Sequence, residues 1–421
     1  MFMKKRYIFK ILTLFMMLSC LVFNNKARAS SQNWNTAIEV VSTVDGVTYY
    51  AYISSDNKEC WIHRIQINVK TDTVHFPAQI NGVVVTKVGS GRDLISETAD
   101  DELYIDIFGK EYDMGEGIAK FSDKRIFVKN VILPENLADI CEAAFVGFKK
   151  IESVIIPDSV SSIDKYTFMM CSSLKEVKLP QKLEQIESTA FDKCKNLKKI
   201  KFEEPSDKYK VKNNMLLSKD EKTLYFVATG IKNANIPKGI KRIVKAAFLT
   251  SYADKITLPA SVNELEQDSL SLKKAPKVIL HKNNRTFVKK NDGIYNKQTG
   301  SLACIIAGDN EVVIPEKVKE INEEISVMGR SKVIKKIVLP TSLKKLSGAW
   351  TRQIYRYKSV CFKGTKPPIT KASKAYPGYE VKPVFCTVYV PKKAKKQYIK
   401  WRLKGENDLD IDELWNKVVS Y

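Results

Sequence analysis

The most constraining feature of the sequence is a period of 23 residues. Prolines and phenylalanines both keep it, at Pro134, Pro157 and Pro180 and at Phe145, Phe168 and Phe191. A fixed period of this size indicates structural repeats that stack, so that each repeat contacts mainly its neighbours. The length of 421 residues alone would suggest two or three domains, but the period predicts one elongated stack.

Seven prolines share the same apolar surroundings, which predict the path of one repeat. The residues three and one positions before the proline, and three and six positions after it, are apolar around Pro134, Pro157, Pro180, Pro237, Pro259, Pro315 and Pro340. The alternation before the proline is typical of a strand with one buried face, and proline ends that strand because it lacks an N–H. The residues after the proline are expected to face inward from a tight segment without strand structure. We therefore predict a mainly β fold, a parallel solenoid whose repeats share one core.

Two gaps between these prolines are longer, and each holds an insert. Pro180 and Pro237 are 57 residues apart, and Pro259 and Pro315 are 56 apart. Segments 209–230 and 287–308 each contain two apolar runs around a polar turn, which predicts a β-hairpin in each insert.

The repeat unit is similar to that of a known family. Residues 154–174 (VIIPDSVSSIDKYTFMMCSSL) and 177–197 (VKLPQKLEQIESTAFDKCKNL) resemble the 23-residue repeat of BspA-type leucine-rich-repeat surface proteins of bacteria. The resemblance runs from about residue 45 to the end, with departures at 90–125 and at Ile325-Ser326, where irregular layers are expected. It implies an exported, surface-associated solenoid used in adhesion or protein binding, without a known catalytic centre.

Residues 1–29 have the pattern of a secretory signal peptide. Basic residues precede an apolar run from Ile11 to Phe23, and Ala27 and Ala29 stand before a cleavage position at Ser30. A lipid-modified Cys20 is the alternative. No later stretch has the ~20 apolar residues of a membrane-spanning helix, so we expect a secreted protein, with retention at the cell surface as a further hypothesis. Seven cysteines follow residue 29 without a regular pairing pattern, and mostly buried thiols are expected.

The mature chain divides by composition. Residues 30–89 are predicted to form an N-terminal β cap and first coil, 90–125 an acidic insert, 126–360 the solenoid, and 361–421 a C-terminal coil with a basic helical cap. Strands are expected over 47–52 and 61–69. Apolar residues at helical spacing predict one helix over 391–404 and a second short helix from Ile411 to Val418.

Positive charge is concentrated towards the C-terminus. Residues 331–404 contain 20 Lys and Arg but one acid, Glu380. Stacking keeps these residues together, so we predict a basic lobe that binds an anionic cell-wall polymer or host glycan. The alternative is that the lysines only keep this end soluble, and no nucleic-acid-binding motif is present. The candidate polyanion-binding residues are Lys392, Lys393, Lys395, Lys396, Lys400, Arg402 and Lys404.

The outward strand positions are the candidate ligand-binding residues. Where a strand buries the residues three and one before the proline, the residue two before it faces outward. These residues are Ile132, Ile155, Lys178, Asn235, Thr257, Val313 and Val338. Their mixed character favours recognition of a host or bacterial surface protein or glycan, although β propensity alone would also explain the apolar members.

Catalytic chemistry finds little support in the sequence. The chain has three histidines, none spaced as metal ligands, and it lacks the motifs of serine hydrolases, zinc proteases and P-loop enzymes. We predict no enzyme activity, no metal and no cofactor. The alternative is a secreted carbohydrate-active hydrolase on a β-solenoid, which would need two carboxylates ~5 to 9 Å apart, with Glu203-Glu204 and Asp100-Asp101 as the candidates.

Overall fold

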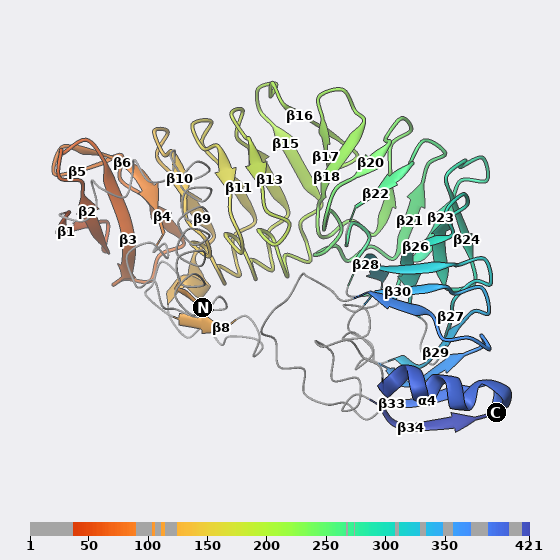
Figure 1. The fold of residues 1–421 in the computed structure, drawn as a ribbon. Helices are drawn as coiled ribbons and strands as arrows, with labels where there is room; N and C mark the ends of the chain where they lie inside the picture. Colours follow the sequence, from red (N-terminus) through yellow and green to blue (C-terminus); the bar gives the residue numbers. More distant parts are fainter. Residues whose placement is uncertain are drawn as a thin grey trace, which may run out of the picture.

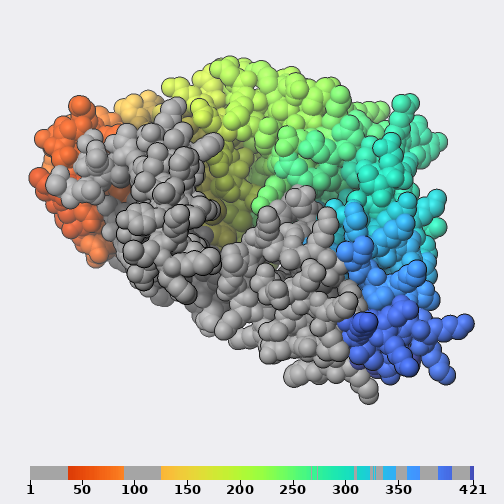
Figure 2. Space-filling model, in the orientation of Figure 1, coloured from red at the N-terminus to blue at the C-terminus, as the bar shows by residue number. Residues whose placement is uncertain are grey.

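The chain forms a curved stack of short strands. The computed structural model describes residues 37–89, 103–105, 111–113, 124–266, 268–272, 274–307, 311–328, 334–347, 357–371, 386–403 and 415–421. β1 (Ile38–Val44) lies at one end, and α4 (Lys395–Leu403) and β34 (Trp415–Ser420) lie at the other (Figure 1). The coils follow one another in sequence order across the molecule (Figure 2). The predicted parallel solenoid is confirmed, and no helix among the described residues is long and apolar enough to cross a membrane.

One strand of each coil builds the first side of the solenoid. Successive strands pair in parallel and in register, with Val154 opposite Val177 and Val177 opposite Ile200. The residues three and one positions before the repeat prolines are all buried, as the alternation predicts. Grouped by sheet, the strands are β4 (Thr73–His75) and β9 (Asn130–Ile132); β11 (Ser153–Ile155), β13 (Glu176–Leu179) and β15 (Lys199–Phe202); β19 (Asn233–Asn235), β21 (Lys255–Leu258) and β23 (Lys277–Leu280); and β27 (Glu311–Val313), β29 (Ile334–Leu339), β31 (Tyr357–Phe362), β33 (Cys386–Val390) and β34.

A second parallel ladder follows the prolines, where the sequence predicts no strand. That prediction is wrong, since Ile163 pairs with Ile186 and Ile243 with Leu265. Stacking brings the same backbone position of successive coils to strand spacing, so N–H and C=O groups pair between coils even where only two residues are extended. The strands are β6 (Val83–Val88), β10 (Asp139–Ile140), β12 (Ser162–Ile163), β14 (Gln185–Ile186), β20 (Arg242–Ile243), β22 (Glu264–Leu265), β28 (Glu320–Met328), β30 (Lys345–Ser347) and β32 (Ile369–Lys371).

A column of phenylalanine rings runs through the core. The ring centroids of Phe145 and Phe168 are 5.3 Å apart, and those of Phe168 and Phe191 are 5.5 Å apart. The turns that carry the rings are also linked, because the Phe145 N–H donates to the Thr167 carbonyl and the Phe168 N–H to the Ala190 carbonyl, both at 2.8 Å. Each coil is therefore held to the next by backbone bonds and by ring packing.

Each insert has three antiparallel strands, one more than the predicted hairpin. The polar turn predicted within 209–230 lies between β17 and β18, but β16 precedes them and pairs with β17. Asn213 and Asn214 connect β16 to β17 with φ of 54° and 57°, the left-handed conformation of a tight hairpin turn. The last strand of each insert joins the second ladder, since β18 pairs with β20 and β26 with β28. The strands are β16 (Tyr209–Lys212), β17 (Met215–Ser218) and β18 (Thr223–Val227), and β24 (Phe287–Lys290), β25 (Gly293–Asn296) and β26 (Ser301–Ile306).

Antiparallel strands precede the first coil. β1 pairs with β2 (Val47–Ile53), and β2 pairs with β3 (Cys60–Ile67), so the strands expected over 47–52 and 61–69 are present. β3 and β6 pair in parallel, which joins this sheet to the second ladder, and β5 (Gln79–Ile80) pairs with β6. In the acidic insert, the described residues form an antiparallel pair of β7 (Leu103–Ile105) and β8 (Glu111–Asp113), and the 3-10 turn η2 (Lys124–Phe127) begins at the end of the insert.

A helix and a strand lie at the C-terminal end. η4 (Lys392–Ala394) and α4 follow Pro391, where the helical spacing predicts them, and Tyr398 is buried with its ring 5.0 Å from that of Phe362. The second helix, predicted from Ile411 to Val418, is wrong where the chain is described, because β34 pairs in parallel with β33. An apolar pattern this short is compatible with a helix or a strand. The open edge of β33 offers backbone hydrogen-bond partners, and pairing with it makes the segment a strand.

Two features of the core were expected from the sequence, namely an irregular coil after Pro315 and buried thiols. The coil after Pro315 is irregular, since β28 runs on for nine residues and the buried Ser326 hydroxyl accepts the Leu270 N–H at 3.0 Å. Cys171 and Cys194 are buried thiols of adjacent coils. They donate to the carbonyls of Phe145 and Phe168, at 3.2 and 3.0 Å.

Candidate functional site

The candidate site consists of the outward side chains of the first-side strands β9 to β33, and is called the strand face below. The two inserts divide it, because their tight turns bond to the strand that follows. Asn213 donates to the Asn235 carbonyl at 3.3 Å, and Asp292 accepts the Val313 N–H at 2.8 Å. After β9, which pairs with β4, the strand face therefore has a first sheet (β11, β13, β15), a second sheet (β19, β21, β23) and a third sheet (β27, β29, β31, β33), whose edge strand is β34.

All seven predicted ligand-binding residues lie on the strand face, but in separate groups. Strand register places them in short rows: Ile155 beside Lys178, Asn235 beside Thr257, and Val313 beside Val338, with Ile132 on the preceding strand. Ile132 and Ile155 are 48% and 59% exposed, whereas Val338 is only 6% exposed. The prediction therefore combines an exposed apolar pair, a polar row and a recessed apolar row.

Ion pairs cover much of the first sheet. The Lys178 ammonium lies 2.7 Å from Glu203, and Glu176 pairs with Lys199 at 3.0 Å and with Lys201 at 3.4 Å. The hydrogen bond from Lys178 lowers the pKa of Glu203. The charge of Lys178 is thus already balanced, so the apolar Ile155 next to it is the better contact residue of this row.

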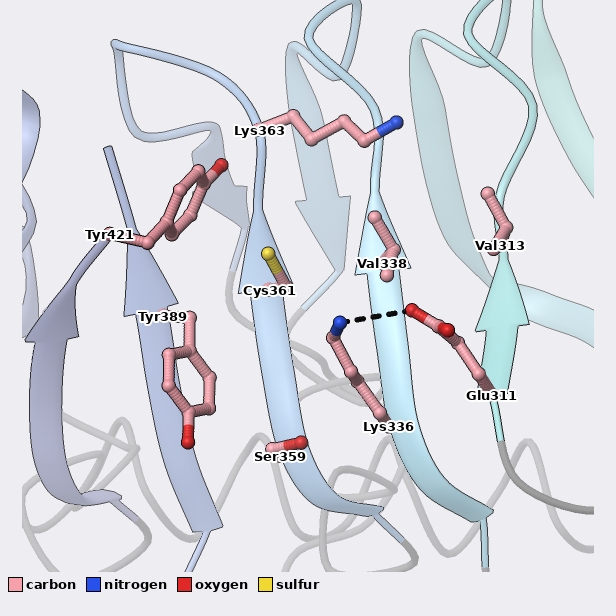
Figure 3. Close-up of a pocket in the computed structure, with 9 residues that line it drawn as sticks. All are labelled: Glu311, Val313, Lys336, Val338, Ser359, Cys361, Lys363, Tyr389 and Tyr421. Carbon is pink, nitrogen blue, oxygen red and sulfur yellow. Dashed lines mark ion pairs between the residues drawn. The ribbon is translucent and has the colours of Figure 1, made fainter.

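The third sheet carries a pocket of about 520 Å³. Its floor is a row of outward residues on three neighbouring strands, Val313, Val338 and Cys361, which strand register places side by side. Tyr389 and Tyr421 stand at one side of this floor (Figure 3). The sequence predicts Val313 and Val338 as contact residues but not the pocket. Tyr389 was missed although it stands two residues before Pro391, as Val338 stands before Pro340, whereas Tyr421 follows β34 outside the repeat.

Charged groups border the pocket on its other sides. Lys336 pairs with Glu311 at 3.0 Å, and this hydrogen bond raises the pKa of Lys336. Lys363 pairs with Glu316 at 3.2 Å.

The Tyr421 hydroxyl donates to the Phe362 carbonyl at 3.0 Å, and burial, with a smaller contribution from the Cys361 thiol, raises the pKa of Tyr421 to about 12. Tyr421 is therefore a neutral aromatic side chain at physiological pH.

The predicted polyanion-binding residues lie around the C-terminal helix. Ala394 and Tyr398 face the core, and at 100° per residue the helix directs the opposite positions outward. The outward lysines are exposed and, within the described part of the chain, have no ion pair: Lys392, Lys393, Lys396 and Lys400. Lys395 is half-buried, while the Arg402 side chain and Lys404 lie outside the described residues. The structure thus brings four of the seven candidates onto one surface.

The described residues offer little for catalysis. They contain no group of three His, Cys, Asp or Glu side chains able to hold a metal ion. Of the pairs considered for a hydrolase, Glu203 is occupied by Lys178, and Asp100-Asp101 lies outside the described residues. The pocket of the third sheet is lined by a single carboxylate, Glu311. Two-carboxylate glycoside hydrolysis therefore finds no pair there.

Comparisons with known proteins identify the repeat. Residues 118–218 and 221–296 match the family described as BspA type Leucine rich repeat region, in six copies. No curated protein matches the chain. Solved structures similar to it at 15% identity include a leucine rich cell surface protein of Faecalibacterium prausnitzii (77% of this chain, 95% of that chain, TM-score 0.31), the pneumococcal vaccine antigen PcpA (92% and 100%, 0.34) and a leucine-rich repeat protein of Bacteroides ovatus (90% and 100%, 0.34).

Proposed function

Because this chain belongs to the BspA-type leucine-rich-repeat proteins, we propose that it is a non-enzymatic binding protein, exported or held at the bacterial surface, whose strand face recognises a macromolecule. The observation that carries the proposal is the third-sheet pocket, with its floor of Val313, Val338 and Cys361. A recessed apolar area bordered by charged groups has the composition of a protein recognition site. The stacked coils hold these side chains on a rigid support.

The basic helix assists attachment in this proposal. The exposed lysines Lys392, Lys393, Lys396 and Lys400 concentrate positive charge on one surface, which attracts an anionic cell-wall polymer or host glycan. Such attraction is screened by salt, because the Debye length falls from ~8 Å at physiological ionic strength to ~3 Å near 1 M. Raised salt is expected to release the protein from cells.

Capture from bacterial and host surface extracts tests the proposal. The variants are Ile155→Asp for the strand face and charge reversal of the four exposed lysines for the helix. Lys182→Glu is the control, because Lys182 is exposed and lies after the strand, off the strand face. We expect Ile155→Asp to weaken protein capture and the helix variant to weaken capture of anionic polymer. Equal capture by all four proteins would reject both surfaces.

A further inference from the structure

We infer that the third-sheet pocket holds an apolar side chain of an acidic polypeptide segment. The inference rests on the proposed function and adds the chemistry of the partner. The pocket volume of about 520 Å³ lies within the ~300 to 1,000 Å³ of sites that enclose a side chain or small ligand.

The floor of the pocket favours an apolar group. Val338 and Cys361 face outward, yet they are only 6% and 9% exposed, because the residues around them rise above the floor. A leucine or phenylalanine side chain placed there would displace water from Val313, Val338 and Cys361 and contact the Tyr389 ring.

The charged residues that line the pocket indicate the composition of the rest of the bound polypeptide segment. Lys336 and Lys363 line the pocket, and each remains about 40% exposed while paired with one glutamate. Ser359 lines the pocket as well, and its hydroxyl donates to the Lys335 carbonyl at 3.2 Å. An ammonium has three N–H donors, so these lysines retain capacity for carboxylates of a partner. Charge complementarity therefore favours an acidic segment.

A glycan fits this pocket less well. Sugar hydroxyls lose free energy when they are buried without hydrogen-bond partners, and the floor offers two valines and a thiol. The observations therefore favour a polypeptide with one apolar anchor over an anionic polysaccharide.

Selection from a display library of linear peptides tests the inference. The full chain is immobilised, peptides are selected, and the affinity of a synthetic copy of one selected peptide is measured. The pocket variants are Val338→Asp and Tyr389→Ala, and the control is Gln185→Asp, because Gln185 is exposed on the second ladder, off the strand face. Poly-glutamate and heparin serve as acidic probes without an apolar side chain. Thermal unfolding shows whether each variant is folded.

We expect selected peptides to combine acidic residues with a leucine or aromatic residue. Both pocket variants should weaken binding about tenfold or more, as loss of a central apolar anchor does, while Gln185→Asp changes it less than about twofold. Poly-glutamate should bind more weakly, with no effect of Tyr389→Ala. Failure to enrich any peptide, binding unaffected by the pocket variants, or heparin binding that depends on Tyr389 would each overturn the inference. Continued capture of a surface protein sensitive to Ile155→Asp would leave the proposed function intact.

Discussion

Phe168 and Phe191, which are 23 residues apart in the sequence, stack with their ring planes only 5° from parallel and their centroids 5.5 Å apart. Both side chains are fully buried. The contact links two coils, neither of which can bury such a ring alone. The phenylalanine column is therefore a measure of how strongly adjacent coils depend on each other.

Phe168→Ala is expected to destabilise the protein by about 3 to 5 kcal/mol, because it leaves a cavity between two rings. Ile155→Ala is the matched control in the same coil, since Ile155 is 59% exposed, and it should change stability by less than about 0.5 kcal/mol. Denaturant unfolding of the three proteins measures the difference. Similar midpoints for both variants would contradict a shared core at this column.

Asp164 is expected to make stability depend on pH. Burial, with the nearby charge of Asp139, raises the pKa of Asp164 to about 6, whereas an unfolded aspartate has a pKa of ~3.9. The folded state holds the Asp164 proton more tightly than the unfolded state does. The stabilisation from protonated Asp164 is therefore complete below pH ~4 and is lost as the pH rises through ~6. Asp164→Asn should therefore be more stable at neutral pH by about 1 to 2 kcal/mol, allowing for solvent screening.

Unfolding midpoints between pH 4 and 8 measure the effect of Asp164, and Asp207→Asn is the control because Asp207 is exposed. The Asp164→Asn curve should be flatter than that of the wild type, with the difference growing towards high pH. A stability gain for Asp164→Asn at acidic pH instead would have the wrong sign.

The Cys171 and Cys194 thiols are expected to be unreactive in the folded protein. Both are buried, and burial raises the pKa of Cys194 well above its ordinary value, so the reactive thiolate is scarce. A thiol reagent followed by mass spectrometry should label these residues only after denaturation. Labelling of the native protein at the rate of the denatured one, or a disulfide between them, would contradict the thiol assignment.

The tight turn of the first insert gives a prediction about Asn214. Its φ of 57° suits asparagine or glycine but not a β-branched residue. Asn214→Val should destabilise the protein by about 1 to 2 kcal/mol, whereas Asn214→Gly should stay within about 0.5 kcal/mol of the wild type. Thermal unfolding compares the two. Equal melting temperatures for both variants would show that the turn conformation is not under steric constraint.

The buried columns of the solenoid are predictable because they depend on positions within one repeat. The inward-facing side chains can be predicted from the apolar alternation before Pro157 and from the spacing of Phe145 and Phe168. The second ladder at Ile163 is different, since only contact between coils makes two residues extended there. The same cause explains β34, where the open edge of β33 overrides a helical spacing.

The candidate site is predictable only in part. The position of Val338 follows from strand alternation, but its recessed exposure depends on neighbours up to 83 residues away, such as Tyr421. The first strand of the first insert had a local signal, because Asn213-Asn214 is a recognisable turn pair. In the pocket, Tyr389 also had a local signal, because it stands two residues before Pro391 as Val338 stands before Pro340. Cys361 and Tyr421 had none, since neither is followed by such a proline.

Site-specific photo-crosslinking tests the central claim most directly, namely that a macromolecule binds the strand face. A benzoylphenylalanine is placed at Ile155 on this face and, in a separate protein, at the exposed Gln185 of the second ladder. Both proteins are irradiated in surface extract. The account predicts a discrete protein adduct from position 155 that is absent from position 185. Adducts from position 185 alone, or of equal yield from both positions, would contradict it.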